Sequence, residues 1–147
     1  MARDLQESAD MAEEQSILSE VNILVSNADW AWPEAVRTIF MPRGINALLA
    51  TEANDVLDII EQRRIHTAIV DMDSERLSGL GTIKMIRVHY PLLPCILVAR
   101  VAARELLSDA LELDVFSVIT KPVDMGVLLE QLNKLFIKRY NSTIFAR

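Results

Sequence analysis

Residues 66–79 read HTAIV-DMD-SERLSG: a short aliphatic run, two carboxylates on either side of a methionine, and a polar loop that ends in glycine. A continuous apolar run of this length, bounded by turn residues, is typical of a strand that is buried on both faces of a parallel sheet. The run ends at Asp71, so we expect this carboxylate at the carboxyl end of a strand. In open parallel sheets, ligands bind at that edge. Asp71 is therefore the first candidate for a functional residue.

The same kind of run recurs four more times, and stretches with helical spacing of apolar residues separate the runs. Alternation of aliphatic strands and helices predicts an α/β fold whose parallel sheet is covered on both faces. We therefore expect a doubly wound, five-stranded parallel sheet with helices on both faces. The four further strands are expected at Val21–Val25, Ile45–Ala50, Pro94–Val98 and Val115–Thr120.

A few residues mark where helices should begin or end. Pro33 suits the first position of a helix that ends before Pro42, because proline lacks the N–H that an interior helical position needs. Asn54 is expected to cap the second helix. The last helix should begin near Asp124, and its buried side should be formed by Met125, Leu128, Leu132 and Leu135.

The composition fits one intracellular domain. The chain has 147 residues, of which 51% are hydrophobic, and a chain of that length buries roughly 70% of its unfolded surface. Its net charge of −6 argues against direct binding of nucleic acid, and no apolar run approaches the roughly 20 residues that cross a bilayer. Cys95 is the only cysteine, which excludes an internal disulfide and fits a reducing compartment. We expect a cytoplasmic protein with an acidic N-terminal extension over residues 1–20.

Charged and amide groups follow three of the predicted strands. Asn27 and Asp29 follow the first, Asp71 and Asp73 the third, and Lys121 the fifth. The carboxyl ends of parallel strands meet at one edge of the sheet, where a nearby ammonium keeps an aspartate ionised. Such an aspartate can attack a phosphoryl group while the lysine neutralises the charge that develops. Oxygen ligands of this kind also suit Mg²⁺.

Two spacings among these residues resemble those of a known family. Gly79 lies eight residues after Asp71, and the Lys121-Pro122 pair lies fifty residues after it. Together with the five strand–helix units, these motifs resemble the receiver domains of bacterial response regulators over residues 21–139. The resemblance implies a flavodoxin-like strand order 2-1-3-4-5. It leaves residues 140–147 as a C-terminal tail.

The resemblance also implies a role for each residue of the predicted edge. Asp71 would be the phosphoacceptor, phosphorylated by a histidine kinase or a phosphotransfer protein, and Lys121 its charge partner. Asp73 would offer its backbone carbonyl to Mg²⁺, with Asp71, Asn27 and Asp29 completing a weak metal site. The Lys121-Pro122 bond would be cis, a conformation that is almost confined to proline. The chain would signal and would not be an enzyme.

Several positions depart from the family pattern. Receivers usually carry a pair of acids after the first strand, where this chain has Asn27 and Ala28. A serine or threonine normally ends the fourth strand, where this chain has Ala99. The aromatic switch residue is replaced by Val118. Arg100 is the available substitute for the missing hydroxyl, although an exposed loop arginine explains it as well. Metal binding and the usual switch are therefore expected to be weakened, but the fold is not.

Three hypotheses follow for the function. The first is a signalling receiver that is phosphorylated on Asp71. The second is a degenerate receiver that binds proteins without phosphorylation, with possible homodimerisation through the fourth helix, the fifth strand and the fifth helix. The third, a remote one, is a haloacid-dehalogenase-like phosphatase, in which Asp73 would be the general acid of an Asp-x-Asp motif. That reading lacks the acidic pair expected after Lys121.

Overall fold

The computed structural model describes residues 20–27, 30–74 and 78–146. Over these residues five strands form one parallel sheet in the order β2-β1-β3-β4-β5. This confirms the predicted order 2-1-3-4-5. The strands are β1 (Asn22–Ser26), β2 (Asn46–Ala50), β3 (Thr67–Asp71), β4 (Cys95–Ala99) and β5 (Ser117–Thr120).

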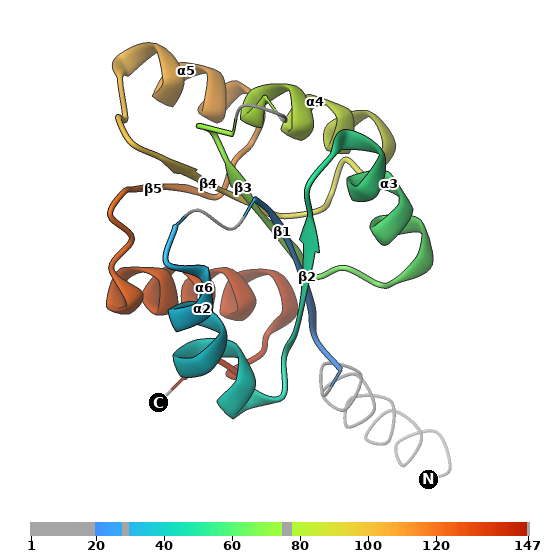
Figure 1. Ribbon diagram of the computed structural model, residues 1–147, viewed down its shortest axis with the longest axis vertical. Coiled ribbons are helices and arrows are strands. Elements are labelled where there is room, and N and C mark those ends of the chain that lie inside the picture. Colours follow the sequence, from blue (N-terminus) through green and yellow to red (C-terminus); the bar gives the residue numbers. More distant parts are fainter. Residues whose placement is uncertain (1–19, 28–29, 75–77, 147) are drawn as a thin grey trace, which may run out of the picture.

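Helices cover both faces of the sheet, as predicted (Figure 1). On one face lie α3 (Ala53–Gln62), α4 (Gly79–His89) and α5 (Arg104–Glu112). On the other lie α2 (Trp32–Ala35) and α6 (Met125–Tyr140). The chain continues from α2 as a π-helix, η1 (Val36–Phe40), and a 3-10 helix, η2 (Met41–Arg43). None of the helices that the structure describes is long and apolar enough to cross a bilayer.

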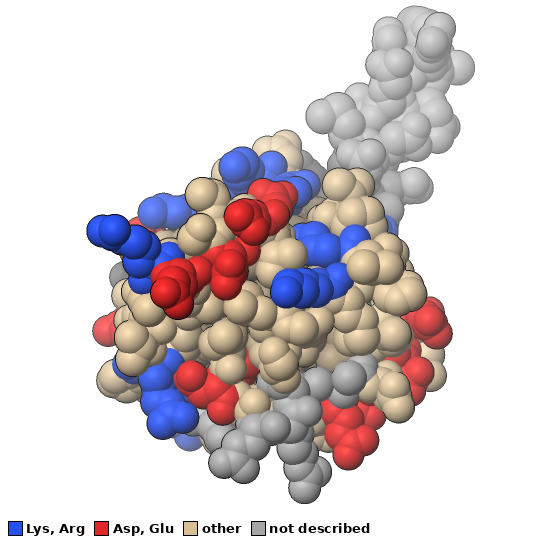
Figure 2. Space-filling model, turned by 90° about the horizontal axis from the view of Figure 1, so that it is seen from above, with Lys and Arg blue, Asp and Glu red and all other residues tan. Residues whose placement is uncertain are grey.

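The outer surface over α3, α4 and α5 carries both signs of charge. Figure 2 shows this face from above: acidic and basic side chains are interspersed, and a broad area between them is uncharged. Exposed apolar residues also belong to α4, α5 and their connections. They are Val88, Leu92, Val101, Leu107 and Leu111, which are between 45% and 82% exposed.

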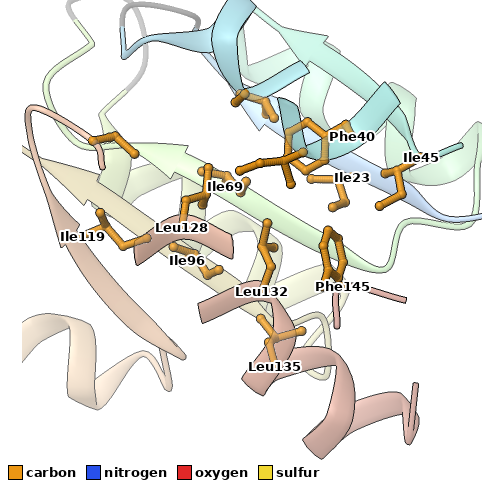
Figure 3. Packing of buried hydrophobic residues seen from close by; sticks show 14 of the residues in the cluster. Ile23, Phe40, Ile45, Ile69, Ile96, Ile119, Leu128, Leu132, Leu135 and Phe145 are labelled. Atoms are coloured by element: carbon orange, nitrogen blue, oxygen red, sulfur yellow. The ribbon is translucent and has the colours of Figure 1, made fainter. Parts of the chain in front are cut away.

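The core on the other face is built by α6 against the middle of the sheet (Figure 3). Leu128, Leu132 and Leu135 recur at helical spacing and are fully buried, so they form one apolar side of the helix. They face isoleucines from three neighbouring strands. These are Ile69 of β3, Ile96 of β4 and Ile119 of β5.

The chain after α6 folds back into this core. Asn141 ends the helix in the left-handed conformation, with φ of 49°, a common way for a helix to stop. Phe145 is then only 1% exposed and packs edge-on against Phe136, with 4.8 Å between the ring centroids. Residues just beyond α6 therefore supply part of the core.

Several predicted boundaries were wrong by one or two residues. β1 and β4 each begin and end one residue later than expected, at Asn22–Ser26 and Cys95–Ala99, whereas Asp71 ends β3 as expected. β2 begins at Asn46, one residue after the predicted Ile45. β5 begins at Ser117, because Val115 donates its N–H to Ala110 at the end of α5 and so belongs to the helix terminus.

Three helix predictions were also wrong. The cap of α3 is Glu52 rather than Asn54: Asp55 turns back and accepts the N–H of Glu52 at 3.0 Å. The first helical stretch does not end before Pro42 but passes through it as η2, because a proline near the start of a new helical turn needs no hydrogen-bonded N–H. Pro33 is the second residue of α2 rather than its first. The expected start near Asp124 is confirmed, since its carboxylate caps α6 by accepting the N–H of Gly126 at 2.7 Å.

His66, directly before β3, is a buried histidine of this core with 1% exposure. Its Nδ1 accepts the N–H of Asn22 at 3.2 Å, and its ring stacks on Phe136 with 6.4 Å between centroids. Nε2 has no hydrogen-bond partner among the described residues. Burial, and then the charge of Arg64, lower the pKa of His66, so the folded protein favours the neutral imidazole.

Acid is therefore expected to destabilise the fold through His66. The unfolded imidazole titrates near its ordinary pKa of about 6.5, whereas the folded protein resists protonation, so the unfolded state binds more protons below that pH. As the pH falls from about 7.5 to about 5.5, the free energy of unfolding should decrease by up to about 1.4 kcal/mol because of His66. Urea denaturation at the two pH values measures the change.

Two asparagine variants serve as controls for this prediction. His66→Asn keeps an acceptor for the N–H of Asn22 but does not titrate, so it should lose this part of the pH dependence. His89→Asn changes an exposed histidine and should keep it. The same pH dependence in the wild type and in His66→Asn would contradict the prediction.

Candidate functional site

The sheet order brings the predicted site residues to one edge. β1 pairs with β2 on one side and with β3 on the other, so the chain reverses direction across the sheet at β1, where open sheets bind their ligands. Asp71 is paired in register with Val98 of β4, and Ala99 with Thr120 of β5. Lys121 follows Thr120, and its N–H donates to the carbonyl of Ala99 at 2.9 Å. Asp71 and Lys121 therefore lie at the same carboxyl edge.

Asp71 is a fully buried carboxylate. Its Oδ1 accepts the N–H of Asp73 at 2.7 Å. Its Oδ2 lies 2.8 Å from Nζ of Lys121 and, apart from this ion pair, has no hydrogen-bond partner among the described residues. Its own N–H donates to Oγ of Ser26 at 3.1 Å. The side chain is thus held rigidly, and one of its oxygens depends on a single cation.

Lys121 lies between two carboxylates. Its Nζ is 2.8 Å from Asp71 Oδ2 and 3.2 Å from Asp73 Oδ2, and the side chain is only 15% exposed. Burial by itself favours the neutral amine, but the hydrogen bonds and charges of Asp71 and Asp73 outweigh it and raise the pKa of Lys121. The ammonium therefore remains charged. The Lys121-Pro122 bond is cis, as the sequence resemblance implied.

The side chain of Asp73 is engaged by two donors. Its Oδ2 accepts the backbone N–H of Arg100 at 2.8 Å and forms the ion pair with Lys121. Partial burial opposes ionisation, but the Arg100 N–H and the Lys121 ammonium prevail and lower the pKa of Asp73. The family resemblance predicted a role for the backbone carbonyl of Asp73. The structure adds that its carboxylate is part of the charge network.

The end of β1 differs from the sequence prediction. β1 extends to Ser26, so Ser26 is the last residue of the strand, and Asn27 is the first residue after it. Ser26 supports the backbone of Asp71, whereas Asn27 adopts φ of 68° and accepts the indole N–H of Trp30 at 3.1 Å through its carbonyl. Asp29, the other predicted metal ligand, lies outside the described residues. The role of Ser26 was missed because the strand was predicted to end one residue too early.

The end of β4 confirms that a hydroxyl is missing. Ala99 is the last residue of the strand and is 1% exposed. Arg100 offers its backbone N–H to Asp73, while its guanidinium is mostly exposed and lies 3.8 Å from the same carboxylate through Nε. Val118 packs into the core under α3, α4 and α5. No aromatic side chain therefore occupies the position before Lys121 that the family uses as a switch.

The structure gives a physical reason for a glycine eight residues after Asp71, at Gly79. A Cβ at this position would lie 2.6 Å from the Cα of Met72 and 2.9 Å from the carbonyl oxygen of Asp71. The start of α4 thus presses against the backbone that carries the carboxylate. Only glycine leaves room for this approach.

The described residues contain no group of three or more histidine, cysteine, aspartate or glutamate side chains that could hold a metal ion. The metal ligands predicted from the sequence within the described residues are the carboxylate of Asp71, the backbone carbonyl of Asp73 and the amide residue Asn27. These are ligand types that Mg²⁺ accepts together with water. Apart from the Lys121 ammonium, Oδ2 of Asp71 has no partner among the described residues, which leaves it a lone pair for an additional cation.

A doubly wound sheet with an Asp–Lys pair at its carboxyl edge is the arrangement that the sequence resemblance implied for a receiver domain. Comparison with known families supports the same class. The sequence profile of the response regulator receiver domain matches residues 23–133. The chain belongs to this family. Receiver domains are modules of two-component signalling rather than enzymes, and the phosphatase hypothesis finds no support.

Curated relatives are similar over most of this chain. A putative NtrX-like response regulator of Rickettsia typhi is 22% identical over 119 residues, which cover 80% of this chain and 25% of that protein. The transcriptional regulatory protein ZraR of Salmonella typhimurium is 24% identical over 118 residues, 80% of this chain and 27% of that protein. This chain therefore spans about a quarter of the length of these relatives.

Solved structures agree with the fold. A response regulator receiver protein from Pseudomonas putida is 30% identical, with a TM-score of 0.68 over 78% of this chain and 96% of that chain. A CheY-like receiver domain protein from Methanospirillum hungatei is 25% identical, with a TM-score of 0.68 over 79% and 94%. Receiver domains typically bind Mg²⁺ at the phosphorylation site and interact with histidine kinases or phosphotransfer proteins.

Replacing Gly79 by alanine is expected to destabilise the protein by about 1–3 kcal/mol, because the new Cβ overpacks the backbone at Met72. Gly81→Ala is the matched control: its Cβ would lie 3.4 Å from Ser78, and alanine favours a helix by up to about 1 kcal/mol over glycine. Urea denaturation of both variants measures the difference. Equal stability of the two variants would show that α4 does not press on the site.

Proposed function

We propose that Asp71 accepts a phosphoryl group from a histidine kinase or a phosphotransfer protein, and that the chain relays the signal through protein–protein contacts. The observation that supports this most is the buried Asp71–Lys121 pair, 2.8 Å apart at the edge of the sheet. Burying an ion pair has a desolvation cost that its attraction often does not offset. Its presence here therefore points to a function rather than to stability. Phosphoryl transfer is such a function, since it needs a rigid nucleophile beside a fixed positive charge.

The proposed step is a displacement at phosphorus. A carboxylate oxygen of Asp71 forms a bond to the phosphorus of a phosphohistidine, the P–N bond breaks, and its electron pair stays on the imidazole nitrogen. An acyl phosphate results. The Lys121 ammonium and the backbone N–H of Arg100, both now directed at Asp73, are donors that the new phosphoryl oxygens can use.

The donor set fits a magnesium ion of reduced affinity. Asp71 and the backbone carbonyl of Asp73 would hold it, with Asn27 and Asp29 as the weaker ligands that the sequence resemblance implied. Such an ion supplies positive charge that neutralises the incoming phosphoryl oxygens. The carboxylate of Asp73 is already shared between Lys121 and Arg100, so it contributes less to the metal.

Activation would follow a different route from the usual switch, because Ala99 and Val118 replace its two side chains. A phosphoryl group on Asp71 and the carboxylate of Asp73 compete for the same donors, Lys121 and the N–H of Arg100. Phosphorylation would therefore release Asp73 from Arg100. Because Arg100 begins the connection between β4 and α5, the signal would reach the surface through this connection.

A degenerate receiver remains the second candidate, and one observation favours it. Asp73 already supplies an anion to Lys121 and to the Arg100 N–H, so the site is neutralised without a phosphoryl group. Such a module would act through docking or homodimerisation over α5, β5 and α6. This surface carries exposed apolar side chains from α5 and α6, namely Leu107, Leu111, Val127 and Ile137.

Beryllofluoride, an analogue of the aspartyl phosphate, is expected to bind in the presence of magnesium and to change the tryptophan fluorescence. Trp30 is the reporter, because its indole N–H is bonded to Asn27 at the edge of the site. Asp71→Asn lacks the acceptor carboxylate and should show no change. Absence of a saturable response in folded wild-type protein would overturn phosphorylation and leave the degenerate receiver.

Removing the charge of Asp73 should strengthen the binding of beryllofluoride. Asp73→Asn can still accept the Arg100 N–H but no longer competes for the Lys121 charge, and a gain of about 1 kcal/mol corresponds to about fivefold tighter binding. Asp58→Asn makes the same charge change at an exposed position of α3 and should leave the affinity unchanged. Weaker binding in Asp73→Asn would mean that the carboxylate assists binding rather than competing with it.

A further inference from the structure

A groove lies at the opposite edge of the sheet from Asp71. Its volume is about 660 Å³, and it is bounded by the end of α3, by the connection from α4 to β4 and by the end of α6. Neither the phosphoacceptor nor its charge partner lines it. The residues that matter for its chemistry are Arg63, Arg64, His89, Tyr90, Leu92 and Arg139.

The groove is basic. Three arginines and a histidine line it, and none of its described lining residues is an aspartate or a glutamate. Arg63 and Arg64 are exposed and form no ion pair with any described residue. Among the described residues, Arg139 pairs only with Asp114, at 3.8 Å. The side chain of Asp114 is 82% exposed, and solvent weakens such a pair strongly. The groove therefore carries uncompensated positive charge in a chain whose net charge is −6.

The groove is also apolar at its floor and rim. Ile60 and Leu93 are 8% exposed and close its base, whereas Leu92 is 82% exposed at its edge. Tyr90 is half-buried between them. A ligand that matches this surface has to combine negative charge with apolar side chains.

We propose that this groove binds the acidic N-terminal segment of the same chain, residues 1–19. That segment has five carboxylates and one arginine, which complement the groove. Its apolar side chains match the floor and rim. They are Leu5, Met11, Ile17 and Leu18.

The point of attachment supports the same segment. The described chain begins at Glu20, and two residues later the side-chain amide of Asn22 donates to the carbonyl of Arg64 at 3.0 Å. The segment therefore enters the fold beside a residue that lines the groove. A tether this short gives an effective concentration in the millimolar range, so even weak charge pairing is enough for docking.

A spin label in the segment tests this in the full chain. Ser8→Cys provides one reactive thiol, because Cys95 is buried and its pKa is raised to about 11, which keeps it unreactive near neutral pH. A nitroxide on residue 8 should broaden the backbone amide signals of Arg64, Tyr90 and Leu92. At about 0.5 M salt, where the Debye length is about 4 Å, the broadening should be reduced.

Charge reversal gives the matched controls. Arg63→Glu with Arg64→Glu should abolish the broadening in the groove. Arg37→Glu with Lys84→Glu reverses two exposed charges outside the groove and should leave the broadening intact. Both double variants are compared at equal stability in urea denaturation.

Three results would overturn the proposal. The first is broadening confined to the residues next to Glu20. The second is broadening that survives reversal of Arg63 and Arg64. The third is broadening that appears only when nitroxide-labelled protein is mixed with isotope-labelled protein that carries no nitroxide. That result would place the segment of one copy in the groove of another.

Discussion

The fold and the proposed chemistry both depend on one buried ion pair, Asp71 with Lys121. A carboxylate with no exposed surface is costly unless a cation lies beside it, and that cation comes from a residue fifty positions later in the chain. Only the strand order that places β3, β4 and β5 side by side brings the two together. β3, β4 and β5 therefore have to pair before the charge of Asp71 is compensated, which couples assembly of the site to assembly of this part of the sheet.

Apolar periodicity was enough to predict the architecture. Runs of β-branched and aliphatic residues identified all five strands, and the strand order followed from the family resemblance. Boundaries failed where a polar residue ends a strand or caps a helix. Ser26 reads as loop in the sequence but hydrogen-bonds to β3 from inside β1, and Glu52 is a less favoured cap than Asn54 yet works because Asp55 reaches back. Such choices are made by tertiary contacts that spacing does not encode.

The candidate site was predicted in part. Asp71 and Lys121 could be found because strand ends are recognisable and their spacing is typical of the family. The carboxylate of Asp73 could not be assigned, because the direction of a side chain after a strand depends on what lies beside it. The neighbour of this carboxylate is the backbone N–H of Arg100. Every residue except proline has such a group, so the residue type at position 100 does not reveal the contact. For Gly79 the position was predicted from the motif, but its physical role was not. The structure shows that role, which is to let α4 approach the backbone of Met72 closely.

Phe145 has a consequence for where this domain can be cut. Similarity to the family covers residues 23–133, yet α6 runs to Tyr140 and a phenylalanine beyond it completes the core. An excised fragment that stopped at the end of the similar region would lose Leu135, Phe136 and Phe145 from the core. Truncating just one buried phenylalanine typically costs about 3–5 kcal/mol. The region of similarity is therefore shorter than the stretch of chain that the domain needs in order to fold.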